Sequence, residues 1–255
     1  MIHRHGRERL FMKLFGKLTA IGVLLGAMSV ATYAKDDNDK TSEEVKRINS
    51  AANVLDEIMA APDKGIPKDV FEGAKCVAVV PSMIKGGFIV GARYGKGAAT
   101  CRTSSGWSAP APITIAGGSW GLQFGGEAVD LVMLIMNDKG MEHLLSSKFK
   151  LGAEGSVAAG PVGRQAEATT DWKMRSEVLS YSRSRGVFAG LELNGAVIKQ
   201  DDEDTRHLYG KEVPFKQILT GQVPAPEGTQ RFISAVRKYA AESREERGSA
   251  EMPKH

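Results

Sequence analysis

The feature that most constrains the fold is a series of short apolar segments, interrupted by glycine, between Cys76 and Gln200. The chain holds 29 glycines but only 9 Phe and 3 Trp. Glycine supplies positive φ at tight turns and destabilises helices, so this composition favours short strands over a helical bundle. Apolar or alternating runs separated by turn residues are typical of an antiparallel sheet that closes on itself or packs as a sandwich.

The pattern predicts several separate strands within this region. They are Cys76–Val80, Gly87–Tyr94, Pro112–Ala116, Gly121–Gly125, Ala128–Met136, Val178–Ser182, Val187–Leu193 and Ala196–Lys199. The segment Asp138–Lys148 interrupts them and predicts a short helix with Asp138 at its N-cap.

Helical periodicity precedes and follows the strands. Thr41–Glu44 forms a capping box, and an apolar stripe then recurs at helical spacing until Pro62 and Gly65 end it. A short helical turn is expected over Pro67–Glu72. A second long helix is expected over Thr229–Glu246, with its apolar positions facing the core.

We therefore expect a single α+β domain over residues 41–246. It should be a curved antiparallel β-sheet, barrel or sandwich flanked by N- and C-terminal helices. Residues 247–255 are expected to form a disordered tail.

The first 34 residues are typical of an export signal. Basic residues precede an apolar run from Leu18 to Val30, and small residues surround Ala31 and Ala34. The alternative is an uncleaved N-terminal anchor, although the apolar run is short for a bilayer span. We expect a periplasmic or secreted protein that associates peripherally with membranes.

The net charge gives no indication of nucleic-acid binding. Residues 1–34 hold 5 of the 34 Lys and Arg but only 1 of the 30 Asp and Glu, so 29 of each remain in the rest of the chain. Binding to nucleic acid needs a persistent basic face, and we expect no such partner. One region is nevertheless locally basic, because no acidic residue lies between Gly73 and Gly126.

The two cysteines, Cys76 and Cys101, both lie in the region of predicted strands. A structural disulfide between them is possible in an exported protein, and the strand register decides whether it forms. No histidine lies near either cysteine at a metal-ligand spacing, so we expect neither a metal site nor a cofactor.

Candidate catalytic residues are few. Gly117–Gly121 matches G-x-S-x-G around Ser119, but the following residues are glycine-broken and strand-like, whereas a nucleophile elbow leads into a helix. His143 and His207 have no evident partner, and Asp201–Asp204 lacks the ligand spacing of a calcium loop, so we interpret it as a solvated loop. A serine hydrolase based on Ser119 remains a remote alternative.

The basic, glycine-rich section from Lys75 to Arg102 is the feature that we interpret as a binding site. Backbone amides next to glycine approach anions closely, and cationic side chains lie beside them in sequence. Anionic lipid head groups are plausible ligands, and each cation near such a surface contributes about 1 kcal/mol. The alternative is that these side chains only solubilise the outer face of strands.

Several strings of the sequence, taken in order, resemble the SYLF-domain family. They are Ala74–Pro81, Lys85–Gly97, Gly106–Pro110, Gly117–Gly125, Asp130–Asn137, Ala158–Arg164 and Tyr181–Gly190, ending at Tyr209–Gly210. The chain looks like a bacterial, exported member related to the yeast Ysc84-type actin-binding proteins, and the resemblance covers about Glu43 to Leu219. The export signal and the lack of an SH3 or FYVE module distinguish it from eukaryotic relatives.

The resemblance implies a non-enzymatic, phosphoinositide-binding-like module. Because the signal indicates export, anionic bacterial phospholipid is the expected ligand, and an envelope scaffold or actin-binding-like host-interaction role with a protein partner is the alternative. The expected lipid-binding side chains are Lys46, Arg47, Lys64, Lys68, Lys75, Lys85, Arg93 and Lys96, with Ile66 and Phe71 dipping into the interface.

Overall fold

The structure, a computed structural model, describes residues 39–61, 65–87, 90–120, 125–146, 148–161, 176–184, 187–189, 191 and 193–250. Two compact units, Met1–Glu43 and Glu44–His255, make up the chain. The sheet, its cores and the sites described below all belong to the second unit. The expected export signal lies outside the described residues.

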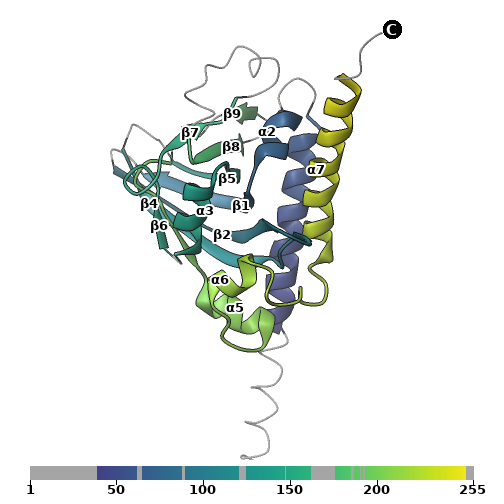
Figure 1. Cartoon of the computed structure of the whole chain (residues 1–255). Helices are drawn as coiled ribbons and strands as arrows, with labels where there is room; N and C mark the ends of the chain where they lie inside the picture. The colour runs from purple at the N-terminus through teal and green to yellow at the C-terminus, as the bar shows by residue number, and fades with distance from the viewer. Residues whose placement is uncertain are drawn as a thin grey trace, which may run out of the picture. The chain divides into compact units, whose positions relative to one another are not determined.

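A curled sheet is the centre of this unit (Figure 1). Its strands are β1 (Cys76–Gly87), β2 (Val90–Thr103), β3 (Gly106–Trp107), β4 (Ala111–Trp120), β5 (Gly125–Ile135), β6 (Lys148–Lys150), β7 (Val157–Ala159), β8 (Val178–Ser184), β9 (Val187–Ala189) and β10 (Val197–Gln200). The order is β6-β10-β4-β2-β1-β5-β8-β7, with β3 beside β2 and β9 beside β8. Among the named strands only β7 and β8 pair in parallel. The α+β class is confirmed, with a mixed sheet that is largely antiparallel.

The β1–β2 hairpin occupies the middle of the sheet. β1 pairs with β5 on its other side, and β2 pairs with β4. A bulge shifts the β1 register between Val79 and Ile84, and within it Ser82 has a φ of 49°. Opposite the bulge, a Cβ at Gly97 would overlap the carbonyl oxygen of Val79, so glycine is required for this close approach.

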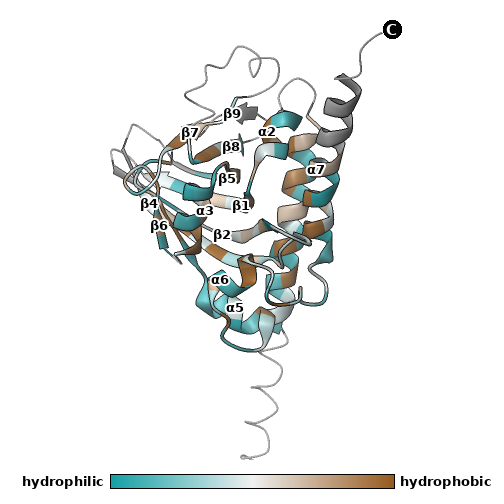
Figure 2. Cartoon of the chain, viewed as in Figure 1, coloured by the Kyte–Doolittle hydropathy of each residue, from teal (hydrophilic) through white to brown (hydrophobic). Residues whose placement is uncertain are grey.

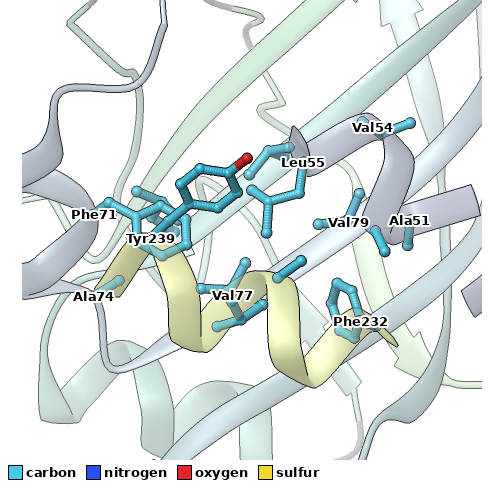
Figure 3. Packing of buried hydrophobic residues seen from close by; sticks show 14 of the residues in the cluster. Ala51, Val54, Leu55, Phe71, Ala74, Val77, Val79, Phe232 and Tyr239 are labelled. Atoms are coloured by element: carbon cyan, nitrogen blue, oxygen red, sulfur yellow. The ribbon is translucent and has the colours of Figure 1, made fainter. Parts of the chain in front are cut away.

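Each face of the sheet carries its own apolar core. Val77 and Val79 point to one face, where they pack against residues 44–59 of the first helix, against α2 (Lys68–Gly73) and against α7 (Gln230–Ala250) (Figure 3). Ala78 and Val80 point to the other face, beside α6 (Phe215–Leu219). We call these the α7 face and the α6 face.

The helices follow the periodicity of the sequence, with differences at their ends. Brown, hydrophobic positions recur between teal ones along both long helices (Figure 2). α7 runs to Ala250, so residues 247–250 are helical and the expected tail is wrong there; residues 251–255 lie outside the described residues. α3 (Asp138–Leu145) is capped by Asn137, not by Asp138, because the Asn137 side chain accepts from the amide of Gly140.

The prediction that Ile66 and Phe71 enter the membrane interface is wrong. Ile66 and Phe71 are 4% and 0% exposed and belong to the core beneath α7, where Phe71 contacts Tyr239 edge to face. The apolar side of α2 faces the sheet. Burial in the core removes more apolar surface from water than insertion into a membrane interface would. Within the described residues, every helix is too short or too polar to cross a membrane.

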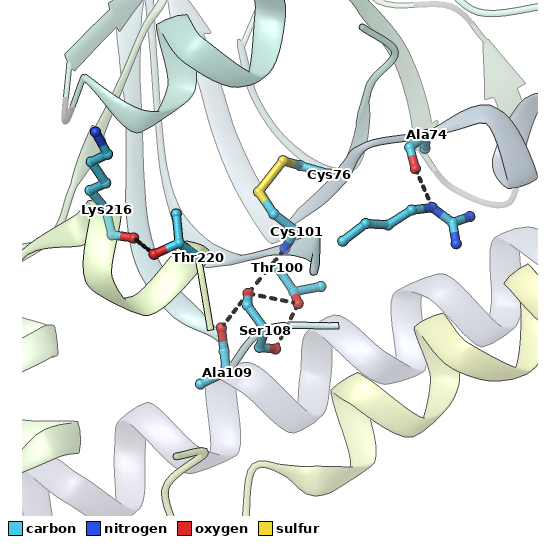
Figure 4. The surroundings of a disulfide bond; sticks show 9 residues. Ala74, Cys76, Thr100, Cys101, Ser108, Ala109, Lys216 and Thr220 are labelled. Carbon is cyan, nitrogen blue, oxygen red and sulfur yellow. Dashed lines mark hydrogen bonds between the residues drawn. A yellow bond between two sulfur atoms is a disulfide. The ribbon is translucent and has the colours of Figure 1, made fainter. Parts of the chain in front are cut away.

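Cys76 and Cys101 form a disulfide, a pairing that the sequence left open (Figure 4). The two cysteines are direct cross-strand partners in β1 and β2, with Cα atoms 4.0 Å apart. Ser108 donates to the carbonyl of Ala109 and accepts from the amide of Cys101, next to the bridge. The bridge therefore fixes the end of the central hairpin at which β3 begins.

Candidate functional site

The predicted lipid-binding cations do not form one surface. Lys85 and Arg93 are partners across β1 and β2 and point to the α6 face, where Lys85 lies 3.9 Å from Glu127 and Arg93 is 8% exposed. Lys96 is three residues beyond Arg93 and points to the α7 face, because side chains alternate along a strand.

The remaining predicted cations are spread over other elements. Lys75 lies 3.1 Å from Asp138, Lys46 is exposed on the first helix, and Lys68 is half-buried in α2. Lys64 lies outside the described residues. These cations are close together in the sequence. In the structure they lie on different faces of the sheet or in separate ion pairs, so they do not act together.

Lys96 and Arg47 instead belong to a partly buried charge network. Lys96 Nζ lies 2.7 Å from Asp204 and 2.9 Å from Asp201, and Arg47 donates to Asp204 at 2.6 Å and to Glu44. Asp201 caps α5 (Asp202–Tyr209), so the solvated loop predicted at Asp201–Asp204 is wrong. The network joins the first helix, β2 and the start of α5.

Protonation in this network follows burial and pairing. Burial disfavours charged Lys96, but hydrogen bonds to Asp204 and Asp201 outweigh it and raise the pKa of Lys96 above its usual 10.5. Burial also opposes ionised Asp201, yet the Asp204 amide, Lys96 and Thr114 lower the pKa of Asp201. Burial and the nearby charge of Asp204 raise the pKa of Glu44.

His207 also reaches this network, contrary to the expectation that it has no partner. Its Nδ1 lies 3.7 Å from Glu44, and ligand atoms of Glu44, Asp204 and His207 lie within 4.8 Å of one another, as in a metal site. Arg47 already bridges the two carboxylates, so a guanidinium supplies the positive charge that a metal would bring. We interpret the network as structural.

An apolar row crosses the α7 face beyond the helices. Ile84 and Tyr94 are direct partners and are 62% and 50% exposed. The same register continues to Ala128 in β5 on one side, and to Ala116 in β4 and Val197 in β10 on the other. Large apolar side chains exposed together on one surface typically mark an interaction site.

Three exposed lysines extend this row. Lys150 pairs in register with Val197, and Lys148 pairs with Lys199, so all three lie on the α7 face. None of them forms an ion pair with a described carboxylate. Like charges on facing strands repel, and an anion would relieve this repulsion. We call Ala128, Ile84, Tyr94, Ala116, Val197 and these lysines the apolar–basic strip.

The apolar–basic strip was not predicted from the sequence. The alternation of Lys148, Phe149 and Lys150 was a usable signal, because Phe149 is buried and the lysines are exposed. What the sequence does not give is which end of the sheet the helices leave uncovered.

The catalytic candidates occupy ordinary structural positions. Ser119 lies in β4 opposite Gly91, and the next described element is β5, a strand and not a helix. His143 Nδ1 lies 2.9 Å from Glu177, so the expectation that His143 has no partner is also wrong.

Comparison with known proteins identifies relatives for most of this chain. Residues 116–239 match the family model Ysc84, described as "Las17-binding protein actin regulator". The SH3 domain-containing YSC84-like protein 1 of Rattus norvegicus is 36% identical over 207 residues, 75% of this chain and 61% of the relative. Protein YSC84 of Saccharomyces cerevisiae is 36% identical over 182 residues, 70% of this chain and 39% of that protein.

These matches agree with the family resemblance that the ordered motifs of the sequence indicate. The chain spans about 60% or less of the length of these two relatives. By its sequence, the chain belongs to the SYLF-domain family of Ysc84-type proteins.

Proposed function

We propose that this protein is a non-enzymatic lipid-binding module that attaches to anionic membrane surfaces through the apolar–basic strip. The observation that carries the proposal is the exposure of Ile84 and Tyr94 on the same face as three lysines that pair with no described carboxylate. An isoleucine enters the acyl boundary, a tyrosine suits the head-group level, and lysines bind lipid phosphates.

The binding free energies expected from the strip residues are large enough for reversible attachment to a membrane. Each lysine near an anionic surface contributes about 1 kcal/mol, and burying an exposed isoleucine contributes about 2 kcal/mol. The backbone of the strip is held by strand pairing, so little ordering of the main chain opposes binding.

Flotation with vesicles tests the proposal. We expect recovery with phosphatidylglycerol vesicles, reduced by salt, and little recovery with phosphatidylcholine. Replacing Lys148, Lys150 and Lys199 by glutamine should lower affinity for the anionic vesicles at least tenfold, since about 3 kcal/mol of attraction is removed. Ile84→Ser with Tyr94→Ser should weaken binding to a similar degree.

A matched control replaces three exposed lysines elsewhere, Lys211, Lys216 and Lys238, by glutamine. This variant has the same net charge as the strip variant and should bind as the wild type does. Equal recovery with neutral and anionic vesicles, unaffected by salt, would exclude the proposal.

The relatives favour a second candidate function, binding of a protein. The family model is named for a Las17-binding actin regulator, and the same exposed Ile84 and Tyr94 would suit a protein partner. Cosedimentation of the lipid-free protein with purified actin filaments tests this candidate. Loss of cosedimentation in Ile84→Ser with Tyr94→Ser would support it, and absence of cosedimentation would exclude actin.

We further propose that the protein works in the bacterial envelope or outside the cell. The buried disulfide supports this, because such bridges persist in oxidising compartments. Mass spectrometry of the mature protein should show a new N-terminus after Ala31 or Ala34. An intact Met1 together with reduced cysteines would contradict export.

We also propose that the protein is not an enzyme. The position of Ser119 within a strand supports this. A nucleophile elbow needs a strand-to-helix turn. A fluorophosphonate probe should therefore leave the protein unlabelled. Labelling that disappears in Ser119→Ala would contradict this expectation.

A further inference from the structure

A second site of a different kind lies at the far end of β2, where the turn to β3 meets α7. An open pocket of about 600 Å³ is formed there. Its polar lining comes from Arg102, Thr103, Ser104 and Arg237, and Trp107 forms part of its wall. None of the described residues that line it is acidic.

Arg102 is held in place before any ligand arrives. Its Nε donates to the carbonyl of Ala74 at 2.8 Å and its Nη2 to the carbonyl of Glu72 at 2.7 Å. The guanidinium also lies over the ring of Trp107, 4.6 Å from the centroid. These contacts fix the position of the guanidinium, so little side-chain entropy is lost when an anion binds.

Arg237 brings a second guanidinium from α7. It is exposed, and no described carboxylate pairs with it. Gly106, in the turn beside the Arg237 side chain, has a φ of 128°. A Cβ added at Gly106 would lie 3.6 Å from Arg237 Nη2. Glycine both permits this backbone conformation and leaves the turn open to the guanidinium.

Hydroxyl groups complete the lining. Thr103 and Ser104 belong to the turn, and Thr103 Oγ1 lies 3.3 Å from Ser105 Oγ. Two guanidinium groups with neutral hydroxyl donors match an oxyanion that carries several acceptor oxygens and more than one charge. A phosphate group has this chemistry.

We propose that this pocket binds a phosphate group through Arg102 and Arg237. The site is separate from the apolar–basic strip, because Tyr94 and Arg102 are roughly eight residues apart along β2, about 26 Å. One phosphate source is a soluble phosphorylated molecule and the other is a lipid head group. The recognition chemistry is the same for both.

Titration of the full chain with inorganic phosphate and with glycerol 3-phosphate tests the proposal. The indole N–H signal of Trp107, identified by its loss in Trp107→Phe, should shift in a saturable manner. Arg237→Ala should weaken binding about tenfold or more, because a charge-assisted bond is lost. Arg237 is exposed, so the variant should fold, and an unchanged thermal midpoint verifies this.

Arg231→Ala is the matched control, since Arg231 is an exposed arginine on the same helix that does not line the pocket. It should bind phosphate as the wild type does. Failure of phosphate to shift the Trp107 signal saturably, or equal affinity in the wild type and Arg237→Ala, would overturn the proposal.

Vesicles containing phosphatidic acid distinguish the two sources. If the lipid is the source, Arg237→Ala should reduce flotation with these vesicles while the strip residues remain intact. If a soluble phosphate is the source, flotation should be the same in Arg237→Ala and Arg231→Ala while the titrations differ. Failure of the strip variants in flotation leaves the pocket titration unaffected, so the two proposals are tested independently.

Discussion

Replacing both Cys76 and Cys101 by alanine is expected to lower the free energy of unfolding by about 3.5 kcal/mol. The bridge closes a loop with a sequence separation of 25, and a loop of this size restricts the unfolded chain by about that amount. Both cysteines are fully buried, so the native packing depends on the bridge as well. Chemical denaturation of the oxidised wild type and the variant measures the difference.

Reduction supplies the control for this prediction. Wild type unfolded and refolded with reductant should lose a similar amount of stability, whereas reductant should leave the double variant unchanged. Equal stability of the oxidised wild type and the double variant would show that the bridge contributes nothing.

Lys96→Met is expected to lower the free energy of unfolding by about 3–5 kcal/mol at neutral pH. Removal of the ammonium leaves the buried carboxylates of Asp201 and Asp204 with one cation fewer, and an uncompensated buried charge is costly. The apolar stem of methionine preserves most of the packing. Denaturant unfolding gives the magnitude.

Two further variants separate charge from packing. Lys199→Met changes an exposed lysine in β10, the strand that pairs with β4. It should change the free energy of unfolding by only about 0.5 kcal/mol. Asp204→Asn introduced together with Lys96→Met should recover at least about 1 kcal/mol, because the two residues are in contact. A fully additive double variant would contradict the role assigned to the network.

The sheet was largely predictable because its signal is local. Alternating apolar residues and glycine indicate strands whichever strand they pair with. The predicted strand Cys76–Val80 lies within β1, and the predicted strand Ala128–Met136 lies within β5 except for its last residue. Pairing of Cys76 with Cys101 needed the register as well, which the sequence left open. α5 was missed because acidic residues that begin a helix resemble a charged loop.

The candidate site was less predictable because its determinants are distant in sequence. Lys96 meets Asp204 108 positions away, and Arg47 meets the same carboxylate 157 positions away. From composition alone, such cations are expected to form a basic surface. In the folded protein, carboxylates distant in sequence neutralise their charge. Conversely, Tyr94 is exposed because it lies in the part of the sheet beyond the helices that cover Val77 and Val79.

The central position of the β1–β2 hairpin determines the order in which the sheet can assemble during synthesis. β4 and β5 follow each other along the chain, yet each adds to a different side of that hairpin. A nascent or truncated chain that ends before β5 leaves the outer hydrogen-bonding groups of β1 open to another copy. Fragments that stop near residue 120 should therefore associate with one another, while chains that include β5 close this edge.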